Sequence, residues 1–194
     1  MTVEKKLDME QNLYESAIKI TKEAGDLVKK SLGSIREIEQ KKNASDLVTE
    51  VDKSTEMFIY GKIKEMFPDH WLLSEEDCGQ ANAYEIFQKQ STGYGWIIDP
   101  IDGTTNFIHG IPHFAVSIGI VKNGEPVVGV VFNPITGDLY TARRAFGAFH
   151  NGQSLQVDIE TKLSEAVVAT GFQAGDFKTG SRVLQQMDQL AGKS

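Results

Sequence analysis

The sequence predicts an α+β fold: a layered α/β sandwich in which long N-terminal helices pack on a mostly antiparallel sheet. Two observations favour this class. Over the first third of the chain, apolar residues recur at three- and four-residue steps, which is the period of an amphipathic helix. From Gly95 onward the pattern changes to short β-rich runs separated by turn residues, which is typical of hairpins.

Two helices are expected in the N-terminal part. The first covers residues 7–32 and ends at Gly33, and its core-facing positions are Leu13, Ala17, Ile20, Ala24, Leu27 and Ser31. An extended piece, SIREIEQ, and a polar loop, KKNASDLVTEVDKS, follow it. The second helix should end before Pro68, because proline disfavours helical geometry in the residue before it. Its inward positions are Phe58, Ile59, Ile63 and Met66.

Strands dominate the middle of the chain. HWLLSEED is expected to form a short strand that leaves its carboxylates at its end, and GWIID, FAVSIGIV, PVVGVVFNP and LYTARR are expected to form four more. The runs KNGE, PITGD and GAFHNGQ between or after them carry turn residues, two of them with an Asn-Gly pair. Further on, EAVVATGF indicates a strand at residues 166–170, and GSRVLQQMDQL indicates a helix.

Composition limits the partners. The 194 residues carry a net charge of −7, and no basic cluster offsets it, so nucleic acid is not expected as a partner. This balance favours a small molecule or a metal cation. The single cysteine, Cys78, allows no intrachain disulfide, which is typical of a reducing compartment. The start, MTVEKKLDMEQ, lacks an apolar core and no run reaches ~18 apolar residues, so we expect a cytoplasmic protein with no membrane span.

One stretch, WIIDPIDGTTNF, joins an apolar strand to two aspartates. Pro100 fixes the backbone between them, so Asp99 and Asp102 are expected on the same side of a turn. Two carboxylates about 4 Å apart repel by roughly 4 kcal/mol at an effective dielectric constant of about 20, so the pair must share a proton or bind a cation. With Glu75 or Glu76 added from the preceding strand end, a cation is the better answer. Oxygen ligands alone favour Mg²⁺ or Mn²⁺ over zinc.

The residues behind the aspartates suit a phosphate. Gly103, followed by Thr104 and Thr105, lets backbone N–H groups face outward, and a helix that starts there would present its positive end to an anion. Metal ions held by Asp99 and Asp102 would activate a water, with Thr104 placed to orient it. The turn therefore predicts metal-assisted hydrolysis of a phosphate ester.

Three motifs together resemble the inositol monophosphatase family: WIIDPIDGTTNF, with DLVTEVD and SEED upstream in the same order and spacing. By average composition, D-P-x-D-G-[ST] arises by chance on the order of 10⁻⁴ times in a chain of this length, so the motif is specific. The likeness extends from the first helix to VATGF. It implies the sugar-phosphatase type of sandwich, Mg²⁺ as the working ion, Mn²⁺ as a substitute, and inhibition by Li⁺.

The resemblance also implies a role for each matching residue. The metal ligands would be Glu75, Asp99, the carbonyl of Ile101, and Asp102. The catalytic residues would be Glu75 and the pair that orients and deprotonates the attacking water, Thr104 and Asp52. The phosphorylated substrate would contact Asp102, Gly103, Thr104 and Thr105.

The family that the sequence resembles runs about a third longer. Its further portion carries a Trp-Asp motif whose aspartate completes a second metal site, whereas Trp96 is the last tryptophan here. We therefore expect residues 1–150 to form an N-terminal α+β domain that binds metal and phosphate, and 151–194 to begin an incomplete C-terminal α/β domain. Water would then replace the absent ligand on Mg²⁺.

The most specific expectation is a homodimer that hydrolyses inositol monophosphate, a small phosphorylated metabolite. Fructose bisphosphate, NADP and a nucleotide phosphate are alternative substrates, and a non-catalytic binding or dimerising protein is an alternative of another class. Asp99 and Asp102 could instead only cap a turn, and Asp52 could be an ordinary helix N-cap. The histidines lack the partners of a zinc site: His109 and His113 are interpreted as packing or supporting residues, and His70 and His150 as structural.

Overall fold

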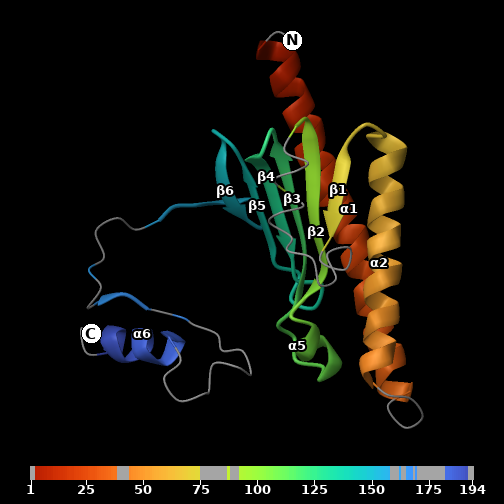
Figure 1. Cartoon of the computed structure of the whole chain (residues 1–194), viewed down its shortest axis with the longest axis vertical. Coiled ribbons are helices and arrows are strands. Elements are labelled where there is room, and N and C mark those ends of the chain that lie inside the picture. Colours follow the sequence, from red (N-terminus) through yellow and green to blue (C-terminus); the bar gives the residue numbers. More distant parts are fainter. Residues whose placement is uncertain are drawn as a thin grey trace. The chain divides into compact units, whose positions relative to one another are not determined.

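The computed structural model describes residues 3–38, 44–74, 87, 92–157, 162, 165–167, 169 and 182–191 (Figure 1). The chain divides into two compact units, Met1–Leu155 and Gln156–Ser194. The described residues of the first unit form two long helices and a seven-stranded sheet. Among the described residues, no helix is both long and apolar enough to cross a membrane.

Both N-terminal helices are longer than the sequence predicted. Helix α1 is Val3–Ile38 and passes through Gly33, so the end expected there and the extended piece after it are wrong. A glycine inside a helix costs only about 1 kcal/mol, which neighbouring helical residues can offset. Helix α2 is Ala44–Met66 and includes most of the expected polar loop. Near its middle the polar residues Asp52 and Thr55 are buried, and hydrophobic periodicity does not count them.

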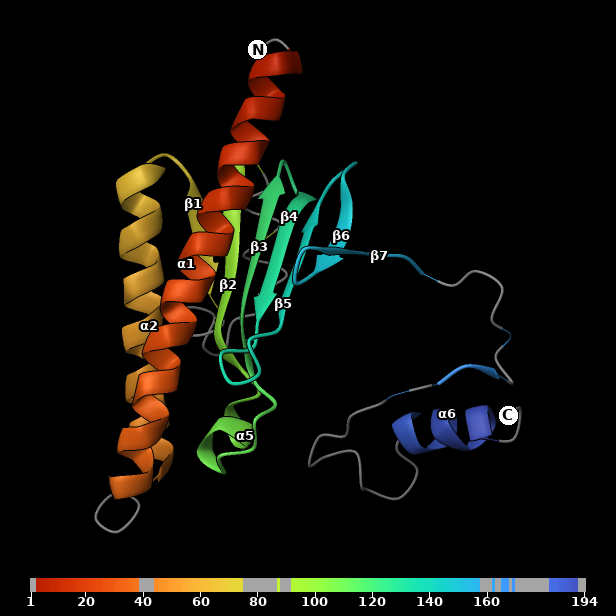
Figure 2. The ribbon, with the colours of Figure 1, turned by 180° about the vertical axis from the view of Figure 1, so that it is seen from behind.

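The two helices cover one face of the sheet (Figure 2). On α1 the buried stripe runs through Leu13, Ala17, Ile20, Ala24 and Val28. Leu27, expected inside, is 36% exposed because Val28 continues the stripe four residues after Ala24. On α2, Ile59 and Ile63 are buried as expected and Phe58 is partly buried, but Met66 is 43% exposed. Phe67, just past the helix end, takes the next inward position.

The sheet contains seven strands in the order of the sequence. They are β1 (Trp71–Ser74), β2 (Tyr94–Asp102), β3 (Ala115–Lys122), β4 (Glu125–Phe132), β5 (Leu139–Arg143), β6 (Gly147–His150) and β7 (Gln153–Leu155). Among the strands that the structure describes, β1 and β2 pair in parallel and every other neighbouring pair is antiparallel. The predicted α+β class and mostly antiparallel sheet are therefore confirmed.

The turns between the strands have the expected chemistry. The β3–β4 hairpin turns at Asn123 and Gly124, with φ of 51° and 80°, and the β6–β7 hairpin turns at Asn151 and Gly152, with φ of 49° and 81°. Positive φ at both central residues is the type I′ geometry that matches the twist of paired strands. A short helix, α5 (Thr104–Ile108), connects β2 to β3.

The second unit contains helix α6 (Arg182–Ala191), as the periodicity of GSRVLQQMDQL predicted. Three residues of the strand expected at 166–170 are described. Ala166, Val167 and Ala169 lie in no regular element, and the other two fall outside the described residues.

The two faces of the sheet differ in character. The face under the helices is apolar and is built from alternate residues such as Trp96, Ile98, Ile118 and Val130. The other face carries a row of side chains paired across the strands: Asp99, Ser117, Val131, Tyr140 and His150. The row starts at the acidic turn, so the pairing of β2 to β6 positions the residues around it.

Candidate functional site

A bulge brings the two aspartates of the turn to one side of the sheet. Asp99 pairs with Ser117 and Asp102 with Ala115, so two residues of β2 oppose the single residue between those partners. Because Ser117 and Ala115 are two residues apart on β3, their side chains share a face, and the aspartates paired with them share it too. Asp99 is half-buried and Asp102 is exposed.

The bulge also directs the carbonyl of Ile101 toward Thr104. The Ile101 side chain is buried in the core beneath the helices. Its carbonyl oxygen accepts a hydrogen bond from the Thr104 hydroxyl, with an O···O distance of 3.1 Å. The structure thus brings together a predicted metal ligand and a predicted catalytic hydroxyl.

Gly103 makes the turn after Asp102 sterically feasible. Its φ of 90° lies in the left-handed region, and a Cβ at this position would sit 3.0 Å from the carbonyl oxygen of His113. The Asn106 side-chain amide donates to that same oxygen at 2.6 Å, which ties the turn to the following loop. Helix α5 has only five residues, so the turn offers fixed N–H groups to an anion rather than the dipole of a long helix.

Helix α2 brings the carboxylate of Glu56 to the C-terminal end of β1 and carries the buried Asp52 one turn earlier. Asp52 is 6% exposed, and Glu56 lies one helical turn later on the same side. The hydroxyl of Ser74, the last residue of β1, donates a hydrogen bond to the Glu56 carboxylate. Ser74 pairs with Ile98, the residue before Asp99. Helix α2 also contacts α5, which begins at Thr104.

Glu75 and Glu76 lie outside the described residues, so the role of Glu75 as a metal ligand stays a prediction from the sequence. Within the described part of the chain, no three His, Cys, Asp or Glu side chains gather closely enough to hold a metal ion by themselves. The described members of the expected ligand set are the two aspartates and the Ile101 carbonyl. All three offer oxygen, the donor that suits a hard divalent cation.

A cavity of about 430 Å³ opens next to the acidic turn. Its lining residues come from the turn, the following loop and strands β3 to β5: Asp102, Gly103, Asn106, His113, Phe114, Ala115, Val131, Asn133, Asp138 and Tyr140. No sequence pattern pointed to Val131, Asn133, Asp138 and Tyr140 as site residues, because strands β4 and β5 and the turn between them bring these residues to the cavity. Of the histidines near the motif, His113 lines this cavity, and both His109 and His113 are exposed.

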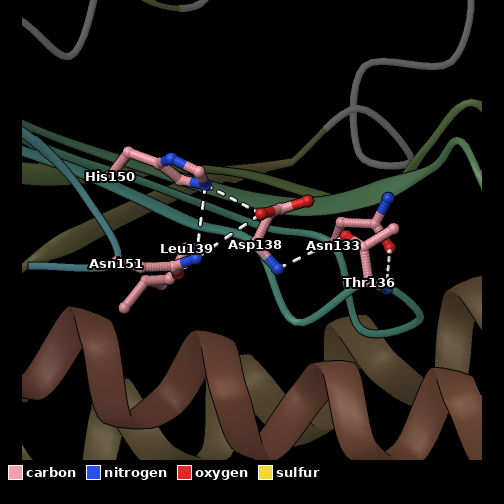
Figure 3. Close-up of polar contacts among 6 residues, drawn as sticks. All are labelled: Asn133, Thr136, Asp138, Leu139, His150 and Asn151. Carbon is pink, nitrogen blue, oxygen red and sulfur yellow. Dashed lines mark hydrogen bonds and ion pairs between the residues drawn. The ribbon is translucent and has the colours of Figure 1, made fainter.

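Asp138, one of the residues that line this cavity, belongs to a small polar network (Figure 3). Its carboxylate lies 2.7 Å from Nε2 of His150 and 3.5 Å from the side-chain nitrogen of Asn151. Hydrogen bonds to Thr136, and then to His150, hold the pKa of Asp138 below its ordinary value. Asp138 therefore stays ionised at neutral pH.

Comparison with known proteins gives a consistent result. A model of the inositol monophosphatase family matches residues 9–191. Inositol monophosphatase 2 of Solanum lycopersicum is 42% identical over 160 residues, which cover 82% of this chain and 59% of that protein. Across eight curated inositol monophosphatases that it matches, the chain spans between 53% and 59% of their length.

Two solved structures of SaIMPase-II are also similar. The one with bound 2′-AMP has a TM-score of 0.76 at 33% identity, over 94% of this chain and 64% of that one. The one with bound inositol monophosphate has a TM-score of 0.68 at 31% identity, over 94% of this chain and 62% of that one.

Proposed function

The chain belongs to the inositol monophosphatase family, and from this premise we propose that it carries the metal- and phosphate-binding part of a phosphomonoesterase that converts inositol monophosphate to inositol and phosphate. One observation supports this most strongly. The bulge in β2 turns Asp99 and Asp102 to the same side, immediately before the Gly103–Thr104 turn. Carboxylates beside fixed N–H groups suit a cation and a phosphate together.

The proposed metal is Mg²⁺, with Mn²⁺ as a substitute and Li⁺ as an inhibitor. Asp99, Asp102 and the Ile101 carbonyl would hold it together with Glu75. When bound, such an ion lowers the pKa of a coordinated water and offsets the negative charge of the phosphate.

The chain's own residues would orient the water and the phosphate. The Thr104 hydroxyl donates a hydrogen bond to the Ile101 carbonyl, so its oxygen is available to accept a hydrogen bond from the attacking water. Asp52, on the helix that contacts α5, is proposed to take the proton from that water. The backbone N–H groups of Gly103, Thr104 and Thr105 are proposed to hold the phosphate oxygens.

A nucleoside 2′-phosphate is the second candidate substrate, because a structure similar to this chain holds 2′-AMP. A non-catalytic binding or dimerising protein is the alternative from another class that the sequence left open. The homodimer and the cytoplasmic location stay predictions from the sequence.

Phosphate release from inositol 1-phosphate, measured with and without Mg²⁺, tests the proposal. We expect Mg²⁺-dependent turnover that Asp99→Asn lowers at least about 100-fold, since loss of a metal ligand exceeds the usual effect of a supporting residue. Asp26→Asn, an exposed aspartate on α1, is the matched control and should keep the wild-type rate. Binding of Mn²⁺, followed by electron paramagnetic resonance, gives an independent readout. If neither turnover nor Mn²⁺ binding depends on Asp99, the proposal is wrong.

A further inference from the structure

A hydrogen bond joins helix α2 to the end of strand β1. The Ser74 hydroxyl donates to Oε2 of the Glu56 carboxylate. Ser74 is 1% exposed and Glu56 is half-buried, so water has little access to the donor. A buried hydroxyl that lost this acceptor would stay without a hydrogen bond, which is costly. The folded chain therefore keeps the contact.

This bond fixes the position of α2 along the sheet. The next inward residues of the helix, Ile59 and Ile63, are apolar and fully buried. Apolar contacts attract without a preferred direction, whereas a hydrogen bond weakens steeply when its donor and acceptor are misaligned. Glu56 thus gives α2 a directional contact with β1, and Asp52, the proposed proton acceptor, lies one helical turn before it.

The strand end that Glu56 contacts adjoins the acidic turn. Ser74 is the last residue of β1 and pairs in parallel with Ile98, the residue before Asp99. Ser74 and Asp99 also line one cavity of about 500 Å³. Because β1 and β2 are parallel, the two chains run on in the same direction, toward Asp99 on β2 and, in sequence, toward Glu75 after β1. One hydrogen bond therefore connects the helix of the proposed proton acceptor with the strand pair that leads to the proposed metal ligands.

We propose that Glu56 is a positioning residue for the metal site: through Ser74 it holds the end of β1 against β2 and so fixes the spacing of the ligands. Glu56 does not bind the ion itself. Its bond to Ser74 is already formed in the metal-free protein, so the ion meets ligands that are held in place before it binds. The inference rests on the proposed function, because the ion is placed at Asp99.

Titration of the full chain with Mn²⁺, followed by electron paramagnetic resonance, tests this role without measuring turnover. Ser74→Ala removes the donor and should weaken Mn²⁺ binding about 10-fold, as loss of a group that supports metal ligands typically does. Ser16→Ala is the matched control and should leave the affinity unchanged, since Ser16 is also buried and its hydroxyl donates to the Asn12 side chain within α1. If Ser74→Ala lowers only the urea midpoint and keeps the wild-type affinity for Mn²⁺, the bond serves stability alone and the proposal is overturned.

A double-mutant cycle tests whether Glu56 acts through Ser74. Glu56→Ala alone should weaken Mn²⁺ binding about 10-fold, and Glu65→Ala, at an exposed glutamate of the same helix, should not. Because one contact is lost in either case, the double variant should again lose about 10-fold, whereas independent effects would multiply to about 100-fold. A loss of about 100-fold would mean that the Glu56 carboxylate acts on the ion directly, and it would overturn the proposal. Ser74→Ala decides alone if the variants without Glu56 do not fold.

These measurements separate the positioning role from the proposed reaction. Mn²⁺ binding that depends on Asp99 but not on Ser74 would contradict only the role of Glu56. Mn²⁺ binding that depends on both residues, without turnover of inositol 1-phosphate, would support the positioning role and contradict only the proposed reaction.

Discussion

The turn at Gly103 allows the local strain of the site to be measured. At φ of 90°, replacing Gly103 by Ala places an L-residue in the left-handed region, which costs about 1–2 kcal/mol. The new Cβ would also lie 3.0 Å from the His113 carbonyl oxygen and 3.3 Å from the Phe114 Cα. Overpacking of this kind costs typically about 1–3 kcal/mol. Gly103→Ala should therefore lower the free energy of unfolding by about 2–5 kcal/mol.

Gly137 provides a matched control for the backbone part of this cost. Its φ is 79°, and no described atom lies within 4 Å of an added Cβ. Gly137→Ala should thus cost only the conformational part, about 1–2 kcal/mol. The measurement is urea unfolding followed by tryptophan fluorescence, because both tryptophans, Trp71 and Trp96, lie in Met1–Leu155. If Gly103→Ala is no more destabilising than Gly137→Ala, the inference that the turn packs too closely against the His113 carbonyl for a Cβ is wrong.

Three further predictions concern the core, pH and catalysis. Ile59→Ala should lower the free energy of unfolding by about 2–5 kcal/mol, because Ile59 is fully buried. Met57→Ala, at a side chain that is 73% exposed, should change it by less than about 0.5 kcal/mol. Equal losses in urea unfolding would contradict the orientation of α2 on the sheet. Burial lowers the pKa of His70 below 6.5, and the His70 Nδ1 accepts a hydrogen bond from Trp96 at 3.0 Å, so the folded state favours the neutral ring. The unfolded chain then binds the proton more readily, so the contribution of His70 to stability should be complete above about pH 6.5 and decline as pH falls through the folded pKa. In urea unfolding, His70→Gln should lose less stability than the wild type as the pH is lowered. An equal loss of stability in both would exclude His70 as its source. Thr104→Ala should lower turnover at least about 10-fold, while its affinity for Mn²⁺ stays within about 2-fold of the wild-type value. An equal fall in turnover and in Mn²⁺ affinity would show that the hydroxyl supports the structure of the site and does not orient the water.

Local patterns predicted most of the sheet, because each strand from β2 onward pairs with its neighbour in sequence through turns that the residue types reveal. The same patterns failed where polar side chains face inward. Asp52 is buried on α2, and a count of apolar positions alone predicts a loop for its segment, residues 41–54. A glycine at position 33 predicts a helix end, but α1 continues through it because the cost of one glycine in a helix is small.

The acidic turn was predicted from residue types, but its geometry has a different cause from the one expected. Pro100 suggested a tight turn, whereas the structure places Asp99 and Asp102 on one side through a bulge against β3. Such a bulge depends on the pairing of β2 with residues 115–117, and the sequence of the turn alone does not predict this pairing. The approach of Asp138 to the Asp102 cavity likewise depends on the register of three successive strand pairs.

The order of the strands has a consequence for how the first unit folds. From β2 to β7 each strand finds its partner in the adjacent segment of chain, so the meander can form one hairpin after another with little loop-closure entropy. Helix α1 is the exception, since it packs on β3 and β4 far along the chain. Its docking is the event of high contact order, and we expect it to set the folding rate, with substitutions at Ala24 slowing folding more than those at the Asn151-Gly152 turn.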